Sequence, residues 1–238
     1  MNGATRLAVI GDGKMGRAVA QLAEAHGFEV VALIGESQVA PQGISRALLD
    51  NANVVIEFTV PDSAAKNVRQ CLALGVPVVC GTTGWDAERA ALEREVAASG
   101  TGTLLWAPNF SLGVHVFARL VEHAARLISQ ANAGFDAAQI ETHHAAKLDA
   151  PSGTARLLAQ HVALGLGHEI PTTSVRTGSV PGTHEILFDA PFEQISLTHV
   201  ARDRRVFASG ALTAARWLVG PPQRRGVFTL DHLLGTTE

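Results

Sequence analysis

The N-terminal segment constrains the fold more than any other part of the chain. An apolar run of strand type, Arg6–Ile10, leads into Gly11-Asp-Gly-Lys-Met-Gly16, which fits the pattern G-x-G-x-x-G. A helical pattern follows from Arg17 to His26, and a second apolar strand from Val30 to Ile34. The order strand, glycine turn, helix, strand predicts a dinucleotide-binding unit, and a structural turn without a nucleotide is the alternative.

Each glycine of this turn has its own task in such a unit. Gly11 permits the tight turn, Gly13 lets the backbone approach a pyrophosphate, and Gly16 lets helix and strand pack closely. We therefore predict that the whole turn contacts the cofactor, through Gly11, Asp12, Gly13, Lys14, Met15 and Gly16.

Charged residues around the turn bear on the choice between NADH and NADPH as cofactor. Glu36, just past the second strand, is placed to accept hydrogen bonds from the adenosine ribose, and its charge would repel a 2′-phosphate. Lys14 and Arg17 act in the opposite direction, although Lys14 can instead reach the pyrophosphate and Arg17 can point to solvent. We expect NADH to be used at least as well as NADPH.

Strand and helix patterns then alternate along the chain. Strand patterns cover residues 53–59, 76–80 and 102–106, and helix patterns cover 61–72 and 86–98. This alternation predicts a doubly wound parallel sheet, in which ligands bind at the carboxyl ends of the strands. Residues at those ends are predicted to line the cofactor crevice, with ordinary loop chemistry as the alternative. They are Thr59, Gly81, Thr82, Thr83, Ala107, Pro108, Asn109 and Phe110.

The pattern changes after a helix at about 111–130. Short strand patterns follow near residues 138–143, 175–177, 184–188 and 194–199, and only one helix interrupts them. Adjacent strands of this kind predict a smaller α+β domain with a mixed or antiparallel sheet. We place this second domain at residues 110–210. The dinucleotide-binding domain then comprises residues 1–109 and 211–238, because the final helix and strand patterns return to it.

The segment Glu141–Ala155, with the sequence E-T-H-H-A-A-K-L-D-A-P-S-G-T-A, holds the densest chemistry. It reads as strand, loop and helix, so the loop faces a helix N-terminus with its unpaired N–H groups and partial positive charge. The hydroxyls of Ser152 and Thr154 and the charge of Lys147 add to a cradle for a carboxylate or phosphate. The alternatives are a plain N-cap and surface histidines. Two adjacent histidines without a nearby Cys lack the usual zinc spacing, so we predict no metal site.

Composition narrows the class of protein. The net charge of -3 gives no general attraction to nucleic acid or anionic membrane. No run approaches the roughly eighteen apolar residues of a membrane span, and no signal peptide is recognised. Two cysteines, Cys71 and Cys80, lack metal or redox spacing and are expected to be buried thiols in a reducing cytoplasm.

The chain resembles the 4-hydroxy-tetrahydrodipicolinate reductase family, also called dihydrodipicolinate reductases, of the diaminopimelate route to lysine. The resemblance covers nearly the whole chain, and the segment Glu141–Ala155 is its most specific part. The glycine turn is one residue shorter than is common in the family, and no arginine follows the second strand, where many members hold the 2′-phosphate of NADPH. Further matches are Lys14–Gly16, Glu57–Thr59, Gly81–Gly84, Asn109–Gly113, Gly182–His184 and Phe207–Ala211.

The resemblance implies a Rossmann-like domain built from both chain ends, a central domain for substrate binding and oligomerisation, and a homotetramer. It implies hydride transfer from NADH or NADPH to a cyclic imine dicarboxylate. His143 matches the proton donor and acceptor, Lys147 a second donor, and His144 with the Gly153 and Thr154 amides the contacts to substrate carboxylates. Ser152 is added to the substrate site from the helix N-terminus. Two alternatives stay open: a related two-domain amino-acid dehydrogenase, and a non-catalytic, NAD(P)-responsive binding protein.

Overall fold

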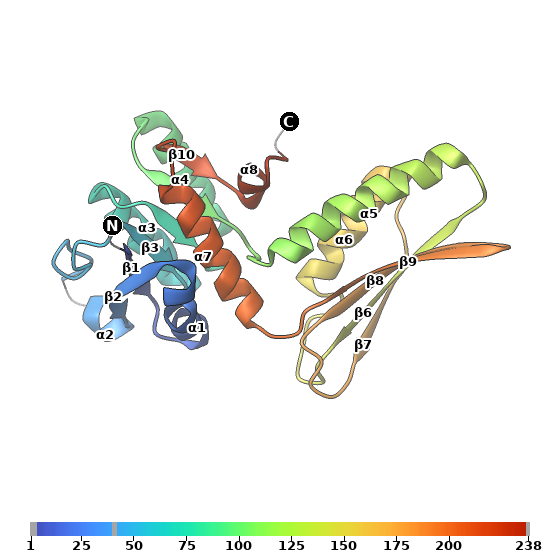
Figure 1. The fold of residues 1–238 in the computed structure, drawn as a ribbon, viewed down its shortest axis with the longest axis horizontal. Coiled ribbons are helices and arrows are strands. Elements are labelled where there is room, and N and C mark those ends of the chain that lie inside the picture. Colours follow the sequence, from blue (N-terminus) through green and yellow to red (C-terminus); the bar gives the residue numbers. More distant parts are fainter. Residues whose placement is uncertain (1–3, 40–41, 237–238) are drawn as a thin grey trace. The chain divides into compact units, whose positions relative to one another are not determined.

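The computed structural model describes residues 4–39 and 42–236, and the chain forms two compact units (Figure 1). Unit 1 contains the chain up to Phe110 and from Phe207 onward, and unit 2 is Ser111–Val206. Unit 1 thus also holds Phe110 and residues 207–210, which the sequence analysis assigned to the second domain. The reason is local packing, since a Cβ at Gly210 would lie 1.7 Å from the Phe110 carbonyl oxygen. Among the described residues, no helix has the length and apolar character needed to cross a membrane.

Unit 1 is built on a six-stranded parallel sheet, in the order β10-β5-β4-β3-β1-β2. This confirms the predicted doubly wound parallel sheet, including the return of the C-terminal strand to its edge. The central strands are apolar on both sides, as a parallel sheet covered on both faces requires. The strands are β1 (Thr5–Ile10), β2 (Phe28–Ile34), β3 (Val54–Glu57), β4 (Val78–Cys80), β5 (Thr103–Trp106) and β10 (Gly226–Phe228).

Alternate residues of β1 face different helices of unit 1. Ala8 and Ile10 belong to the buried cluster that includes α3 and α4, whereas Val9 lies against Gly16 of α1. The first helix begins at Lys14 and ends at Leu22, before a 3-10 turn, so the predicted helix to His26 was too long. The helices are α1 (Lys14–Leu22), α2 (Glu36–Val39), α3 (Pro61–Ala73), α4 (Asp86–Ser99), α7 (Arg205–Val219) and α8 (Leu230–Leu234).

Unit 2 is a four-stranded sheet in the order β7-β6-β8-β9, with β6 parallel to β7 and antiparallel to β8. This confirms the predicted mixed sheet. Two helices, α5 (Leu112–Ala131) and α6 (Gly153–Leu166), lie side by side over one face of the sheet (Figure 1). Their apolar stripes meet Ile186 and Phe188 of the sheet in one buried core. The strands are β6 (Asp136–His143), β7 (Thr172–Arg176), β8 (Thr183–Ala190) and β9 (Glu193–Val200).

Candidate functional site

The first candidate site is a cavity of about 480 Å³ at the carboxyl ends of β1, β2 and β3. The strand order reverses at this point, because β2 lies on one side of β1 and β3 on the other. Such a switch point is where ligands bind in open α/β sheets. Of the predicted cofactor residues, this cavity is lined by Gly11, Asp12, Gly13, Glu36 and Thr59. An adjoining hollow is lined by Gly13, Lys14, Met15, Thr59, Gly81, Thr82 and Thr83.

The glycine turn has the geometry that a dinucleotide needs. Gly11 has a φ of 104°, and a Cβ there would lie 2.0 Å from the Phe58 carbonyl oxygen. A Cβ at Gly16 would lie 1.7 Å from the Gly11 carbonyl oxygen, so α1 can approach the turn only because this residue is glycine. Gly13 has nothing within 4 Å of its absent Cβ, which leaves room for a pyrophosphate.

A buried carboxylate organises the floor beside the turn. Glu57, at the end of β3, accepts hydrogen bonds from the Thr82 hydroxyl at 2.7 Å and from the Thr59 hydroxyl. The Thr82 hydroxyl in turn accepts the Thr59 amide at 2.8 Å. Thr59 and Thr82, two of the three threonines predicted to line the cofactor crevice, thus have their hydroxyls hydrogen-bonded within the protein and shape the hollow. Sequence reasoning noted Glu57 only through the family resemblance.

Both cysteines are free and buried, as predicted. The Cys80 thiol donates to Glu57 at 3.1 Å, and burial together with that carboxylate raises the pKa of Cys80 well above its usual value. Burial raises the pKa of Cys71 to about 12. Neither thiol is a nucleophile at neutral pH.

The residues Ala107 to Phe110, which were predicted to line the cofactor crevice, are not among the residues that line these two hollows. Ala107 and Phe110 are each 2% exposed, and the Phe110 ring packs edge-on against Phe58 with 6.0 Å between ring centroids. The aromatic side chain of this turn is therefore part of the core of unit 1. Turn composition alone does not separate such a residue from one that faces a ligand.

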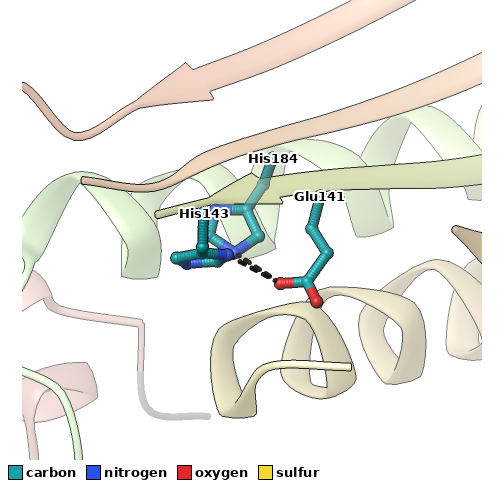
Figure 2. A group of neighbouring side chains, drawn as sticks. All are labelled: Glu141, His143 and His184. Carbon is teal, nitrogen blue, oxygen red and sulfur yellow. Dashed lines mark ion pairs between the residues drawn. The ribbon is translucent and has the colours of Figure 1, made fainter. Parts of the chain in front are cut away.

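The second candidate site lies in unit 2, where β6 brings Glu141 and His143 to one face of the sheet. The two residues are two positions apart on a strand, so their side chains point the same way. His184 of β8 lies directly opposite Glu141 in the strand register. Figure 2 shows the three side chains pointing toward one another: Glu141 Oε2 is 3.0 Å from His143 Nδ1 and 3.9 Å from His184 Nε2.

Glu141 is fully buried, yet it is held as a carboxylate. Its Oε1 accepts the Ser152 amide at 3.0 Å, the Ser174 hydroxyl at 2.7 Å and the Arg176 guanidinium at 2.7 Å. Burial by itself would raise the pKa of this carboxyl, but the hydrogen bonds from Ser152, Arg176 and Ser174 outweigh it and bring the pKa to about 2. The site therefore contains a fixed negative charge.

The two histidines of this cluster are neutral at pH 7. Burial lowers the pKa of His143; Glu141 acts against this, while the cations Lys147 and Arg176 lower it further. Burial, with the neighbouring His143, lowers the pKa of His184 to about 4. A proton on either ring therefore needs additional negative charge nearby.

Lys147 and His144 lie in the loop after β6. The Lys147 ammonium binds Asp149 at 2.8 Å, and its backbone amide donates to the His144 carbonyl at 3.0 Å. The Arg204 guanidinium lies 3.2 Å from His144 Nε2, which therefore acts as the acceptor. Both side chains are partly exposed, so they are accessible to a ligand while already tied to a charged neighbour.

The N-terminus of α6 follows this loop. Ser152 is the N-cap, because its hydroxyl accepts the Ala155 amide at 3.1 Å; the same hydroxyl lies 3.3 Å from His184 Nε2. Ser152 is only 2% exposed, so its hydroxyl serves as a helix N-cap, which was the alternative to a contact with a ligand. Gly153 is exposed and has nothing within 4 Å of its absent Cβ, so the first turn of α6 can be approached by an anion. Thr154 lies in the same first turn.

Sequence reasoning missed four members of this cluster as site residues: Glu141, Ser174, Arg176 and His184. Strand alternation could have paired Glu141 with His143, since both stood in the segment singled out. Ser174 and Arg176 could not be found in this way, because they join the site through the pairing of β7 with β6. Ligand atoms of Glu141, His143 and His184 lie within 4.8 Å of one another, a spacing that could hold a metal ion. The absence of a metal site stays a prediction.

Comparison with known proteins gives matches over both units of the chain. Residues 5–110 match the family described as dihydrodipicolinate reductase, N-terminus, and residues 113–234 match dihydrodipicolinate reductase, C-terminus. The 4-hydroxy-tetrahydrodipicolinate reductase of Alkalilimnicola ehrlichii is 35% identical, over 97% of this chain and 99% of its own length. That of Chromobacterium violaceum is 38% identical, over 79% of this chain and 76% of its own.

A solved structure is similar over the same extent. The dipicolinate-bound dihydrodipicolinate reductase from Paenisporosarcina sp. TG-14 has a TM-score of 0.75 and 26% identity, and the match covers 95% of this chain and 97% of that one. The family resemblance read from the sequence is confirmed. The chain belongs to the dihydrodipicolinate reductase family, the NAD(P)H-dependent 4-hydroxy-tetrahydrodipicolinate reductases of diaminopimelate and lysine biosynthesis.

Proposed function

We propose that this chain reduces 4-hydroxy-tetrahydrodipicolinate to tetrahydrodipicolinate, with the 4-hydroxyl lost as water, and that His143 is the proton donor and Lys147 a second donor. The observation that carries the proposal is the joint position of a buried histidine, an ammonium and an open helix N-terminus on one short segment of unit 2. The glycine turn of unit 1, with its open space at Gly13, fits a dinucleotide. The bound dinucleotide would supply the hydride.

The protonation state of His143 supports this role. The ring is neutral in the free protein, because burial and the nearby cations lower its pKa. A dicarboxylate brings two negative charges to the site and so raises that pKa, which loads the ring with a proton when the substrate is present. The proton is then delivered next to the position that receives the hydride. Lys147 stabilises the negative charge that develops there.

The N-terminus of α6 is the proposed substrate-carboxylate site. The amides of Gly153 and Thr154 lie in its first turn, and the helix dipole adds a partial positive charge. His144, in the loop between β6 and α6, is proposed as a further contact to a substrate carboxylate. The dipicolinate-bound relative supports a planar dicarboxylate as the ligand class.

The assay that tests this function follows oxidation of the reduced cofactor with freshly generated substrate. His143→Gln and Lys147→Ala are each expected to lower kcat by about a hundredfold or more, the scale of a lost proton donor. Both residues end or follow a strand outside the apolar core, so far-UV circular dichroism should be unchanged. His168→Gln, an exposed histidine after α6, is the matched control. Wild-type turnover in either folded site variant would refute the assignment.

We propose that NADH serves at least as well as NADPH. The cavity at the ends of β1 to β3 is lined by the carboxylates of Asp12, Glu36 and Asp62 and by one ammonium, that of Lys66. Arg17 donates to the Asp12 carbonyl at 2.7 Å, so it is already engaged at the turn. This balance of charge disfavours a 2′-phosphate.

Comparing kcat/KM for the two cofactors checks this preference. We expect Glu36→Gln to raise kcat/KM for NADPH relative to NADH, because one repelling charge is removed. A wild-type preference for NADPH above about tenfold, or roughly 1.4 kcal/mol, would show that Lys14, Arg17 or Lys66 outweighs the carboxylates.

We also propose that unit 2 is the substrate-binding and oligomerisation domain of a cytoplasmic homotetramer, with the small dicarboxylate as its ligand and no nucleic acid or membrane partner. One face of its sheet is covered by α5 and α6, and the other carries exposed apolar side chains, among them Val175 at 38% and Val200 at 55% exposure. Exposed apolar strands of this kind favour association between copies. Two buried protonated thiols suit the reducing cytoplasm.

A further inference from the structure

We propose that Glu141 is the positioning residue for His143, fixing the ring so that Nδ1 keeps its proton and Nε2 exchanges one with the substrate. The inference rests on the proposed function of His143 and adds the device that sets its tautomer. The carboxylate, the ring and His184 are drawn in Figure 2. Each is more than nine-tenths buried.

The tautomer follows from the hydrogen-bonding capacity of the two groups. Glu141 Oε2 and His143 Nδ1 are both buried and lie 3.0 Å apart, and neither atom has a hydrogen-bond partner elsewhere among the described residues. Because an ionised carboxylate only accepts hydrogen bonds, a proton on Nδ1 is the arrangement that satisfies both atoms. The neutral ring then has its lone pair on Nε2. When the ring is protonated, the proton on Nε2 is the one that can leave without breaking the pair with Glu141.

The Glu141 carboxylate cannot rotate away from His143, because its other oxygen, Oε1, accepts hydrogen bonds from two directions. Ser174 and Arg176 donate to Oε1 from the neighbouring strand β7, and the Ser152 amide donates to it from the start of α6. A carboxylate fixed at one oxygen presents the other in a constant direction. The same three donors explain how a charge can be buried here without a counter-ion on Oε2.

The surroundings favour a direct contact between the carboxylate and the imidazole over a metal ion at this cluster. A divalent cation bound to Oε2 would lie close to the Arg176 guanidinium on the same carboxylate, and the Lys147 ammonium also acts on both histidines. Coulomb repulsion from two cations opposes a third. His184 approaches Oε2 less closely, at 3.9 Å, and its Nε2 lies near the Ser152 hydroxyl instead.

The Nε2 side of the His143 ring is bordered by Gly182. A Cβ at Gly182 would lie 3.1 Å from Nε2 and 3.4 Å from Cδ2, so glycine is what keeps a side chain off this edge of the ring. Gly182 immediately precedes β8, the strand that holds His184. Nδ1 thus faces a buried carboxylate, and Nε2 faces the edge that glycine keeps open. This is the arrangement expected if Nδ1 keeps its proton and Nε2 exchanges one with the substrate.

Nitrogen-15 NMR of the full-length wild-type protein tests the tautomer without any substitution. We expect the His143 resonances, assigned by their loss in His143→Gln, to show Nδ1 protonated and Nε2 unprotonated above the pKa of the ring. A predominant Nε2–H tautomer would overturn the inference even if His143 proved essential for turnover. Loss of activity on treatment with a chelator, restored by Zn²⁺, would also overturn it, because Glu141 would then be a metal ligand.

Kinetics of Glu141→Gln test the consequence for catalysis. The groups that face His143 are Glu141, Lys147, Asp149, Arg176 and His184. Of the two carboxylates, Glu141 is the one in direct contact with the ring. We expect kcat to fall about a hundredfold with KM changed by less than about threefold, and the basic limb of the kcat profile to move to lower pH, because a charge that favours the imidazolium is lost.

A matched control is Glu185→Gln, on β8 next to His184 but on the opposite face of the sheet, where its carboxylate accepts from Ser196. It should leave kcat and the pH profile unchanged. If Glu141→Gln folds and keeps both wild-type kcat and the wild-type profile, Glu141 has no positioning role, while the assignment of His143 stands on its own variant. If Glu141→Gln does not fold, the tautomer of the wild-type ring decides.

Discussion

Buried titratable side chains in unit 2 show how single residues are kept in one charge state. Glu141 is ionised because three donors meet one of its oxygens, whereas His184 is neutral because burial outweighs the attraction of that same carboxylate. Each state is set by partners within a few ångströms, and each makes the free energy of unfolding depend on pH.

His184 is expected to make the protein less stable as pH falls from about 6.5 to 4. The pKa of His184 is about 4 in the folded chain and 6.5 in the unfolded chain, so the unfolded chain binds more protons between these two pH values. Its contribution is complete above about pH 6.5 and is lost as pH falls toward 4, at most about 3 kcal/mol. Urea unfolding at pH 7 and pH 5 should show a smaller difference in His184→Gln than in the wild type.

The same experiment on His168→Gln, an exposed histidine, should reproduce the wild-type pH dependence. Equal pH dependence in His184→Gln and the wild type would mean that His184 is not the group that titrates. Glu141 contributes in a lower window: its stabilisation is present above about pH 4.5 and is lost as pH falls toward 2.

At the scale of elements, the turn between β1 and α1 combines a role in folding with a proposed role in cofactor binding. Gly11 and Gly16 are required by the approach of backbone to backbone, whereas Gly13 has a φ of -72° that any residue can adopt. Replacing Gly16 by alanine therefore tests stability, and replacing Gly13 by alanine tests cofactor binding.

Gly16→Ala is expected to lower the melting temperature, because the new methyl group would collide with the Gly11 carbonyl and displace α1, a cost of about 1–3 kcal/mol. Gly13→Ala should keep the wild-type melting temperature but raise the Kd for the dinucleotide by tenfold or more, about 1.4 kcal/mol, since its methyl group occupies the space left for the pyrophosphate. Thermal scans and cofactor titration of both variants measure this. Unchanged cofactor affinity in Gly13→Ala would place the pyrophosphate elsewhere.

At the scale of the whole molecule, the two units differ in how their sheets are covered. Helices pack on both faces of the parallel sheet, whereas α5 and α6 cover one face of the mixed sheet. The uncovered face carries Val175 and Val200, on the strands at its two edges. Association between copies would remove this apolar surface from water.

Val200→Asp is therefore expected to weaken the proposed homotetramer, because it places a charge on a surface that association would bury. Light scattering after size exclusion should give four times the 25.0 kDa chain mass for the wild type and a smaller assembly for the variant. Leu127→Asp, an equally exposed leucine on α5, is the control and should stay tetrameric. A monomeric wild type would contradict the proposed assembly.

Much of the fold was predictable because its signals are local. The glycine turn, the alternation of strand and helix, and the N-cap Ser152 each depend on residues a few positions apart. The segment Glu141–Ala155 pointed to the proposed substrate site for the same reason. The end of α1 was misjudged, since a helical pattern does not show that the last turn becomes a 3-10 turn closed by Gly27 at a φ of 75°.

The sequence by itself thus determined the two kinds of sheet, the family and the segment that holds His143 and Lys147. Only the tertiary structure decided that Ser174, Arg176 and His184 surround Glu141, that the hydroxyl of Thr82 is bound to Glu57, and that Phe110 is core. The physical reason is that hydrogen bonds, desolvation and Coulomb forces depend on distance in space. Those distances are set by the register of strands that lie tens of residues apart in the chain.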